Sequence, residues 1–119
     1  KKYILEKVPW CDVGYFINAD NFGSMIEYNL GLIFPQEASS MIPALALDVK
    51  PGMKVLDMAA SPGAKTTQIA QYMKNKGCII ANDVKNYRIN VLVTNLQRSG
   101  VLIAYVTLRD GRSFSKFEN

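Results

Sequence analysis

The sequence has no histidine, and this absence removes several kinds of catalytic chemistry. Histidine is a common zinc ligand and general base. A zinc site or a Ser-His-Asp triad is therefore not expected, and we predict no metal site. Cysteine is also scarce, because Cys11 and Cys78 are the only two and do not form a C-x-x-C pair. This usage fits a reducing, intracellular compartment, and we expect a cytoplasmic protein.

Long hydrophobic runs are missing as well. No stretch approaches the roughly 20 apolar residues that span a bilayer, and the first residues do not continue into a signal-peptide core, so we expect no membrane partner. With 49% apolar and 20% charged residues, the 119-residue chain fits one compact domain. The net charge of +4 permits contact with a phosphate backbone but does not identify a nucleic-acid partner, because the basic residues are scattered.

Residues 1–35 carry the weakest pattern, and we expect them to form an N-terminal extension. Turn formers from Asn18 to Gly23 separate two apolar segments, Val13–Ile17 and Leu30–Phe34, which suggests short strands joined by an irregular loop. Three aromatic residues could offer a stacking surface for bases, although we expect them to be buried. They are Trp10, Tyr15 and Phe16.

The pattern changes at Gln36, and residues 36–119 are predicted to form the main domain. The segment from Gln36 to Asp48 has a helical period, and Pro43 should either kink that helix or mark its true start. The positions that predict its buried face are Ala38, Met41, Ile42 and Leu45.

Apolar strands and helices then alternate along the chain. The predicted strands are Val55–Met58, Cys78–Ala81 and Leu102–Leu108. The predicted helices are Thr66–Lys76, with Ile69, Ala70 and Met73 inward, and a second whose buried face is Ile89, Leu92, Val93 and Leu96, ended by Gly100. This alternation is typical of an α/β fold with a parallel sheet and right-handed crossovers.

The loop after the first strand would let a ligand approach closely. Ligands of such sheets bind at the carboxyl ends of the strands. Residues 59–64 have small side chains and lead into a helix, whose free N–H groups attract a carboxylate or phosphate. Asp83, after the second strand, could accept hydrogen bonds from a ribose diol, and Asp110, after the third, could receive an adenine amino group. Taken alone, Asp57, Asp83 or Asp110 could be a simple turn former at the end of a strand. Because an acid follows each of three successive strands, a ligand site is favoured.

Two phosphate-binding motifs fail at this loop. A P-loop would need glycine where Met58 stands, and Ala64 separates Gly63 from Lys65. The dinucleotide fingerprint G-x-G-x-x-G fails because the loop has one glycine. A nucleoside-type ligand without a pyrophosphate remains. S-adenosylmethionine fits, with an adenosine for the acids and an amino-acid end for the loop.

At these residues the sequence closely resembles the RNA cytosine-5 methyltransferases of the Sun-domain (nucleolar Nop/Sun) family, especially archaeal members that modify tRNA or rRNA. The family motif D-M-C/A-A-A-P-G-G-K-T-T stands here as D-M-A-A-S-P-G-A-K-T-T, from Asp57 to Thr67. The similarity extends from about Leu5 to Phe114. Further matching segments are Gln36–Pro43, Asn82–Val84 with Arg88, and Asp110–Gly111.

The resemblance implies a Rossmann-like S-adenosylmethionine-dependent methyltransferase fold, of which this chain holds the first three parallel strands. It implies tRNA or rRNA as the partner. The backbone N–H groups of Gly63 and Ala64 would lie near the cofactor carboxylate, and Lys65 would lie near both cofactor and target base. Asp83 would hold the ribose hydroxyls and Asp110 the adenine amino group. The implied cofactor-binding residues are Ala60, Ser61, Pro62, Gly63, Ala64, Lys65, Asp83, Arg88 and Asp110.

The chain departs from the family in its loop and in its cysteines. Ser61 and Ala64 stand where the family mostly has alanine and glycine. We interpret Ala64 as the first helical residue, a position that needs no positive φ. The family's reaction uses a cysteine thiolate that adds to cytosine carbon 6 and a second cysteine that helps release the product. Their motifs, D-A-P-C and T-C-S, are absent, and neither Cys11 nor Cys78 matches them, so no catalytic residue is predicted in this chain.

Three functions stay open. The chain could be the cofactor-binding part of an RNA cytosine-5 methyltransferase. It could instead be a non-catalytic cofactor- or RNA-binding module or split subunit, or a methyltransferase for protein or small molecules. The last would share the loop but not Gln36–Pro43. By the resemblance, the strand at Val55 belongs in mid-sheet, so here it would be an unpaired apolar edge. We therefore expect a fragment of a longer enzyme, or a partner chain that covers this edge.

Overall fold

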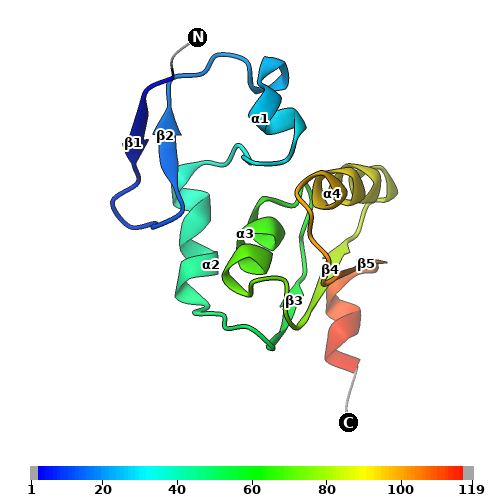
Figure 1. The fold of residues 1–119 in the computed structure, drawn as a ribbon. Coiled ribbons are helices and arrows are strands. Elements are labelled where there is room, and N and C mark those ends of the chain that lie inside the picture. The colour runs from blue at the N-terminus through cyan, green and yellow to red at the C-terminus, as the bar shows by residue number, and fades with distance from the viewer. Residues whose placement is uncertain (1–2, 117–119) are drawn as a thin grey trace.

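The computed structural model describes residues 3–116, which form two small sheets with helices beside them (Figure 1). The strands are β1 (Leu5–Lys7), β2 (Tyr15–Ile17), β3 (Lys54–Asp57), β4 (Cys78–Asp83) and β5 (Ala104–Leu108). The helices are α1 (Ile26–Asn29), α2 (Ile42–Ala46), α3 (Ala64–Tyr72) and α4 (Asn86–Arg98), with 3-10 helices η1 (Phe22–Ser24), η2 (Ala38–Met41) and η3 (Gly111–Lys116). Within 3–116, no helix is long and apolar enough to cross a bilayer.

The larger sheet is parallel, with the order β3-β4-β5. Its strands overlap the three segments that the sequence predicts, although β3 begins at Lys54 and β4 continues to Asp83, and α3 and α4 connect them. Parallel neighbours need such crossovers, because the chain must return to the same end of the sheet before the next strand begins. The predicted α/β fold is confirmed, and β3 is an edge strand of the described sheet.

One face of this sheet is covered by both helices. Helix α3 packs Ile69 and Met73 against Ile79 of β4, and α4 packs Leu92 against Ala81 of the same strand. Ile79 and Ala81 are two residues apart and therefore point to the same side of the sheet. The core thus lies on that side, and the inward positions predicted for α3 are confirmed as buried.

The opposite face carries an apolar row without a covering layer among the described residues. Leu56, Ile80 and Tyr105 are neighbours across the three strands. Leu56 is 42% exposed and Tyr105 is 64% exposed. The sheet is therefore open both along its β3 edge and on this face.

Pro43 marks the true start of α2, one of the two outcomes predicted for it. It lies in the first turn of the helix, where backbone N–H groups have no partner within the helix, so the N–H that proline lacks is not needed. The predicted buried face is only partly correct, because Ala38, Met41 and Leu45 are partly buried whereas Ile42 is half exposed. The fully buried residue of this helix is Ala44, which was not predicted. The preceding turn is the 3-10 helix η2, whose three residues per turn shift the phase of the apolar positions.

The N-terminal extension differs most from the prediction. Strand β2 lies within Val13–Ile17 as expected, but it pairs antiparallel with β1, which the sequence reasoning missed. Leu30–Phe34 forms no strand. Gly31 has a φ of +74° and packs so closely on the Arg98 carbonyl that a Cβ would collide with it. This segment is therefore an irregular strap against the end of α4.

The expected burial of Trp10, Tyr15 and Phe16 is wrong, because each is about half exposed. All three belong to the β1–β2 ribbon or the loop that connects its strands. Figure 1 shows this ribbon at the side of the molecule, away from the larger sheet. A two-stranded ribbon without a covering layer cannot bury side chains on both of its faces.

Candidate functional site

The predicted loop leaves β3 at its carboxyl end and enters α3 at Gly63. Gly63 is the N-cap residue of α3, with a φ of +109°, a left-handed conformation that glycine adopts without strain. Ala64 is the first residue of the helix, which confirms our interpretation and places the start before the predicted Thr66. A Cβ at Gly63 would lie 3.3 Å from Leu92 Cδ1, so the loop passes directly over α4.

Asp83 is the most strongly held acid of the site. Its side chain is 4% exposed, and Arg88 Nε lies 3.1 Å from Oδ2. The same carboxylate accepts the backbone N–H groups of Val84 at 2.9 Å, Lys85 at 3.3 Å and Ser61 at 3.3 Å. Three backbone hydrogen bonds therefore use most of the acceptor capacity of the carboxylate, and Arg88 adds an ion pair. In this structure Asp83 holds the loop, and a ribose diol, which donates two hydrogen bonds, could bond fully only if one of these groups moved away.

Arg88 and Ser61 form a second connection between the loop and the start of α4. Arg88 Nη2 donates to the Ser61 carbonyl at 2.6 Å, and Ser61 Oγ donates to the Arg88 carbonyl at 2.9 Å. The serine at a position where the resemblance led us to expect alanine thus has a hydrogen-bond partner. Arg88 lies beside Asp83, as predicted.

Backbone hydrogen bonds shape the rest of the loop. The Ala60 N–H donates to the Asn82 carbonyl at 2.8 Å, and the Pro62 carbonyl accepts the Asn95 amide at 2.8 Å. The Gly63 N–H donates to the Ala60 carbonyl at 2.7 Å. The tight turn thus uses this N–H, and its expected place near a cofactor carboxylate stays a prediction.

Two further side chains attach α3 to its neighbours. Lys65 Nζ donates to Ser40 Oγ at 2.7 Å, which joins the start of α3 to η2. Thr66 Oγ1 donates to Asp57 Oδ2 at 2.8 Å, which joins it to the end of β3. Asp57 therefore has a structural role, whereas the predicted substrate contact of Lys65 stays a prediction.

Asp110 lies in the loop after β5 and is paired with Arg112. Arg112 Nη2 lies 2.6 Å from Oδ2, and Arg112 Nε lies 3.0 Å from Oδ1. These side-chain hydrogen bonds, with one from the Arg112 backbone, lower the pKa of Asp110 to about 2. The carboxylate remains ionised at neutral pH, and in this structure Arg112 contacts both of its oxygens.

Neither cysteine lies at the carboxyl edge of the sheet. Cys78 begins β4 and Asp83 ends it, so the two are about 16 Å apart at the usual rise of a strand. Cys11 is buried in the N-terminal extension, with Sγ 3.6 Å from the Tyr72 hydroxyl. Burial, together with that contact, raises the pKa of Tyr72. Neither thiol therefore lies at the candidate site.

The sequence reasoning missed one residue of this edge, Asn82. It is fully buried at the end of β4 and donates hydrogen bonds to the carbonyls of Met58 and Arg109, beyond the two neighbouring strands. Its place in the segment Asn82–Val84 was the only signal in the sequence. An amide at a strand end carries no chemistry that would have distinguished it.

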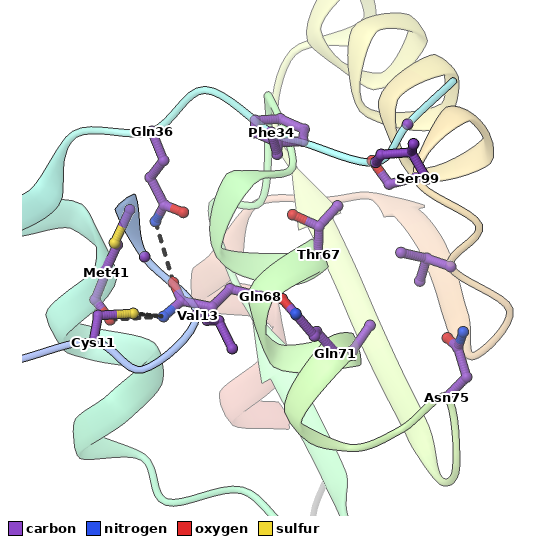
Figure 2. A pocket seen from close by; sticks show the side chains of 15 residues that line it. Cys11, Val13, Phe34, Gln36, Met41, Thr67, Gln68, Gln71, Asn75 and Ser99 are labelled. Carbon is purple, nitrogen blue, oxygen red and sulfur yellow. Dashed lines mark hydrogen bonds between the residues drawn. The ribbon is translucent and has the colours of Figure 1, made fainter. Parts of the chain in front are cut away.

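A cavity of about 400 Å³ lies elsewhere, between the N-terminal extension and α3 (Figure 2). Amide side chains are prominent in its lining, and Gln36 Nε2 donates to Gln68 Oε1 at 3.3 Å. Gln68 Nε2 also contacts Cys11 Sγ, as Figure 2 shows. None of the predicted cofactor-binding residues lines this cavity. The candidate site is therefore the edge of the sheet and not this hollow.

Solved structures first identify the class of protein. A methyltransferase homologue from Pyrococcus horikoshii matches with a TM-score of 0.88 at 40% identity, over 96% of this chain and 38% of that one. NSun6 from the same organism, solved with SFG, matches with a TM-score of 0.79 at 34% identity, over 85% and 26% of the two chains. The chain has the Rossmann-like fold of a methyltransferase.

Sequence comparison then identifies the family. The family model described as 16S rRNA methyltransferase RsmB/F matches residues 44–119, and the chain belongs to this family. It is 58% identical over 122 residues to the tRNA (cytosine(49)-C(5))-methyltransferase of Pyrococcus abyssi, and 46% identical over 121 residues to ribosomal RNA small subunit methyltransferase F of Aliivibrio fischeri. These matches cover 100% and 96% of this chain, which spans only 39% and 26% of those relatives. The resemblance to RNA cytosine-5 methyltransferases is confirmed.

Proposed function

We propose that this chain forms the S-adenosylmethionine-binding part of an RNA cytosine-5 methyltransferase. The observation that carries the proposal is the junction of the small-residue loop, the N-terminus of α3 and the buried Asp83 at one edge of a parallel sheet. This edge is where open α/β sheets bind their ligands.

Each part of the edge suits one part of the cofactor. The N-terminus of α3 favours the carboxylate of the methionine end, because free N–H groups and the helix dipole both attract an anion. Asp83 would accept ribose hydroxyls in place of one of its present donors, with Arg88 beside it. Asp110 would accept the adenine amino group. When bound, the cofactor supplies a methyl group on a sulfonium.

We further propose tRNA or rRNA as the substrate. The relatives are named for cytosine 49 carbon 5 of tRNA and for small-subunit rRNA. The net charge of +4 is compatible with a phosphate backbone. Because Cys11 and Cys78 both lie away from the edge, this chain would bind the cofactor without itself supplying the thiolate that activates cytosine. That placement also supports the second candidate, a cofactor-binding module that performs no chemistry.

Calorimetric titration of the chain with S-adenosylmethionine tests the proposal. We expect micromolar binding that weakens about tenfold or more in Asp83→Asn, since a hydrogen bond to a charged group contributes on the order of 1.5–3 kcal/mol. Asp48→Asn is the matched control, because it makes the same chemical change at an exposed acid in the turn before β3. It should bind like the wild type.

Two results would contradict the proposal. One is the absence of binding by the folded wild-type chain, which would mean that residues 1–119 do not form the site by themselves. The other is equal weakening in both variants. The thermal unfolding midpoint of each variant, measured by circular dichroism, separates a lost contact from a lost fold.

A further inference from the structure

Asn82 connects the ends of all three strands of the parallel sheet. Its Nδ2 donates to the Met58 carbonyl at 3.1 Å and to the Arg109 carbonyl at 2.9 Å. Its Oδ1 accepts Thr107 Oγ1 at 2.9 Å and the Arg109 N–H at 3.0 Å. The residue is 0% exposed, so these four bonds satisfy a fully buried amide.

The backbone of the same residue adds a further connection. The Asn82 carbonyl accepts the Ala60 N–H at 2.8 Å, so the loop after β3 is held at both Met58 and Ala60. On the other side, the Arg109 N–H is shared between Asn82 Oδ1 and the Asp83 carbonyl, at 3.0 and 3.2 Å. Asp83 is the next residue, and Asp110 follows Arg109. The side chain of Asn82 therefore ties the loop after β3 to the loop after β5, directly beside Asp83.

We infer that Asn82 is a positioning residue that sets the loops after β3 and β5 relative to Asp83, and thereby the affinity for an adenosine-containing cofactor. This inference rests on the proposed function. The side chain acts through Met58, Thr107 and Arg109, and no contact of its own with a ligand is implied. An amide is the suitable group, because it offers two donors to two carbonyls and an acceptor to a hydroxyl and an N–H.

Asn82→Asp tests the inference with almost no change of shape. The carboxylate keeps the acceptor for Thr107 and Arg109 but loses both donors, so the hydrogen bonds to the Met58 and Arg109 carbonyls are lost. We expect the dissociation constant for S-adenosylhomocysteine, measured by calorimetry, to rise about tenfold or more. Amide hydrogen exchange should accelerate at residues 58–60 and 109–111 while Ile79 and Ala81 keep their protection.

Ile79→Val is the matched control, since Ile79 is equally buried on the same strand but lies near its opposite end. It should lower the free energy of unfolding but leave the affinity for S-adenosylhomocysteine unchanged. It should not accelerate exchange in the two loops more than in the rest of the sheet. If Asn82→Asp does not fold, hydrogen exchange of the wild-type chain still tests whether the Asn82 side chain makes these bonds. Its Asn82 carboxamide protons should exchange far more slowly than those of the exposed Asn90.

Several results would overturn the inference. They are unchanged affinity in Asn82→Asp, uniform acceleration of exchange over the whole sheet, and carboxamide protons of Asn82 that exchange as freely as those of Asn90. If the wild-type chain does not bind the cofactor, the proposed function of this chain fails, but the exchange at the two loops still decides whether Asn82 positions them.

Discussion

At the scale of single residues, the candidate site is organised by polar side chains that bond to loop backbone. Asp83 accepts three backbone N–H groups, and Ser61 and Arg88 each donate to the carbonyl of the other. Such bonds are strong where the groups are buried, because an unpaired partner would lose its hydration without compensation. These contacts within the chain hold the loop in place, and a loop held in this way costs less entropy to order when a ligand binds.

Asp110 allows a prediction about pH at the same scale. Arg112 lowers its pKa to about 2 from an ordinary value of 3.8. Since the folded pKa lies below the unfolded one, the pair favours the folded state above pH 3.8, and this contribution is lost as the pH falls through about 2. In Arg112→Gln we expect the pKa of Asp110 to rise towards 3.8, as followed by carbon-13 NMR of the carboxyl group.

Lys74→Gln is the control for that titration, because it removes a distant exposed cation and should leave the pKa of Asp110 unchanged. An Asp110 that titrates alike in wild type and Arg112→Gln would show that the ion pair does not form in solution.

At the scale of elements, the N-terminal extension is attached to the main sheet through α4. The Arg98 guanidinium lies 3.7 Å from the centroid of the Tyr28 ring and 5.9 Å from that of Phe34. Trp10 Nε1 also donates to the Ala38 carbonyl at 3.2 Å, so contacts cross the predicted boundary after residue 35. The division into 1–35 and 36–119 stays a prediction.

The stacked pair of Tyr28 and Arg98 can be tested by a double-mutant cycle. We expect Tyr28→Leu and Arg98→Gln each to lower the free energy of unfolding in urea, with a coupling of about 0.5–2 kcal/mol, the usual range for a cation over an aromatic ring. Strictly additive effects would mean that the ring and the guanidinium do not interact.

The elements also differ in how well sequence predicts them. The crossover units β3-α3-β4-α4-β5 could be predicted because their apolar periods are local and their turns carry glycine. The structure of the N-terminal extension could not be predicted, because strand pairing depends on residues that are distant in the sequence. Leu30–Phe34 is as apolar as a strand, yet no strand lies beside it, and it packs on Arg98 instead.

At the scale of the whole molecule, the parallel sheet is open on one edge and one face. Strand β3 is unpaired on its outer side within residues 3–116, and Leu56 and Tyr105 are exposed on the face opposite the helices. Exposed apolar edges of this kind promote association between chains.

We therefore expect the isolated chain to self-associate as its concentration rises, as measured by sedimentation velocity. Leu56→Lys should shift the chain towards the monomer, because a lysine on an edge strand opposes pairing. Val91→Lys is the matched control, since it places the same charge at an exposed apolar position of α4 and should not change the association. A wild-type chain that stays monomeric at high concentration would contradict this expectation and the predicted need for a partner.

The sequence by itself determined the order of strands and helices from β3 to β5, the place of the small-residue loop and the acids at the strand ends. Periodicity and residue type are local properties, and a helix after a small-residue loop needs no distant partner to be predicted. Only the tertiary structure decided that Asp83 is held by Ser61, and that Asn82 joins the three strand ends. These partners lie 22 to 27 residues apart in the sequence, and they meet only because a parallel sheet brings its carboxyl ends to one edge.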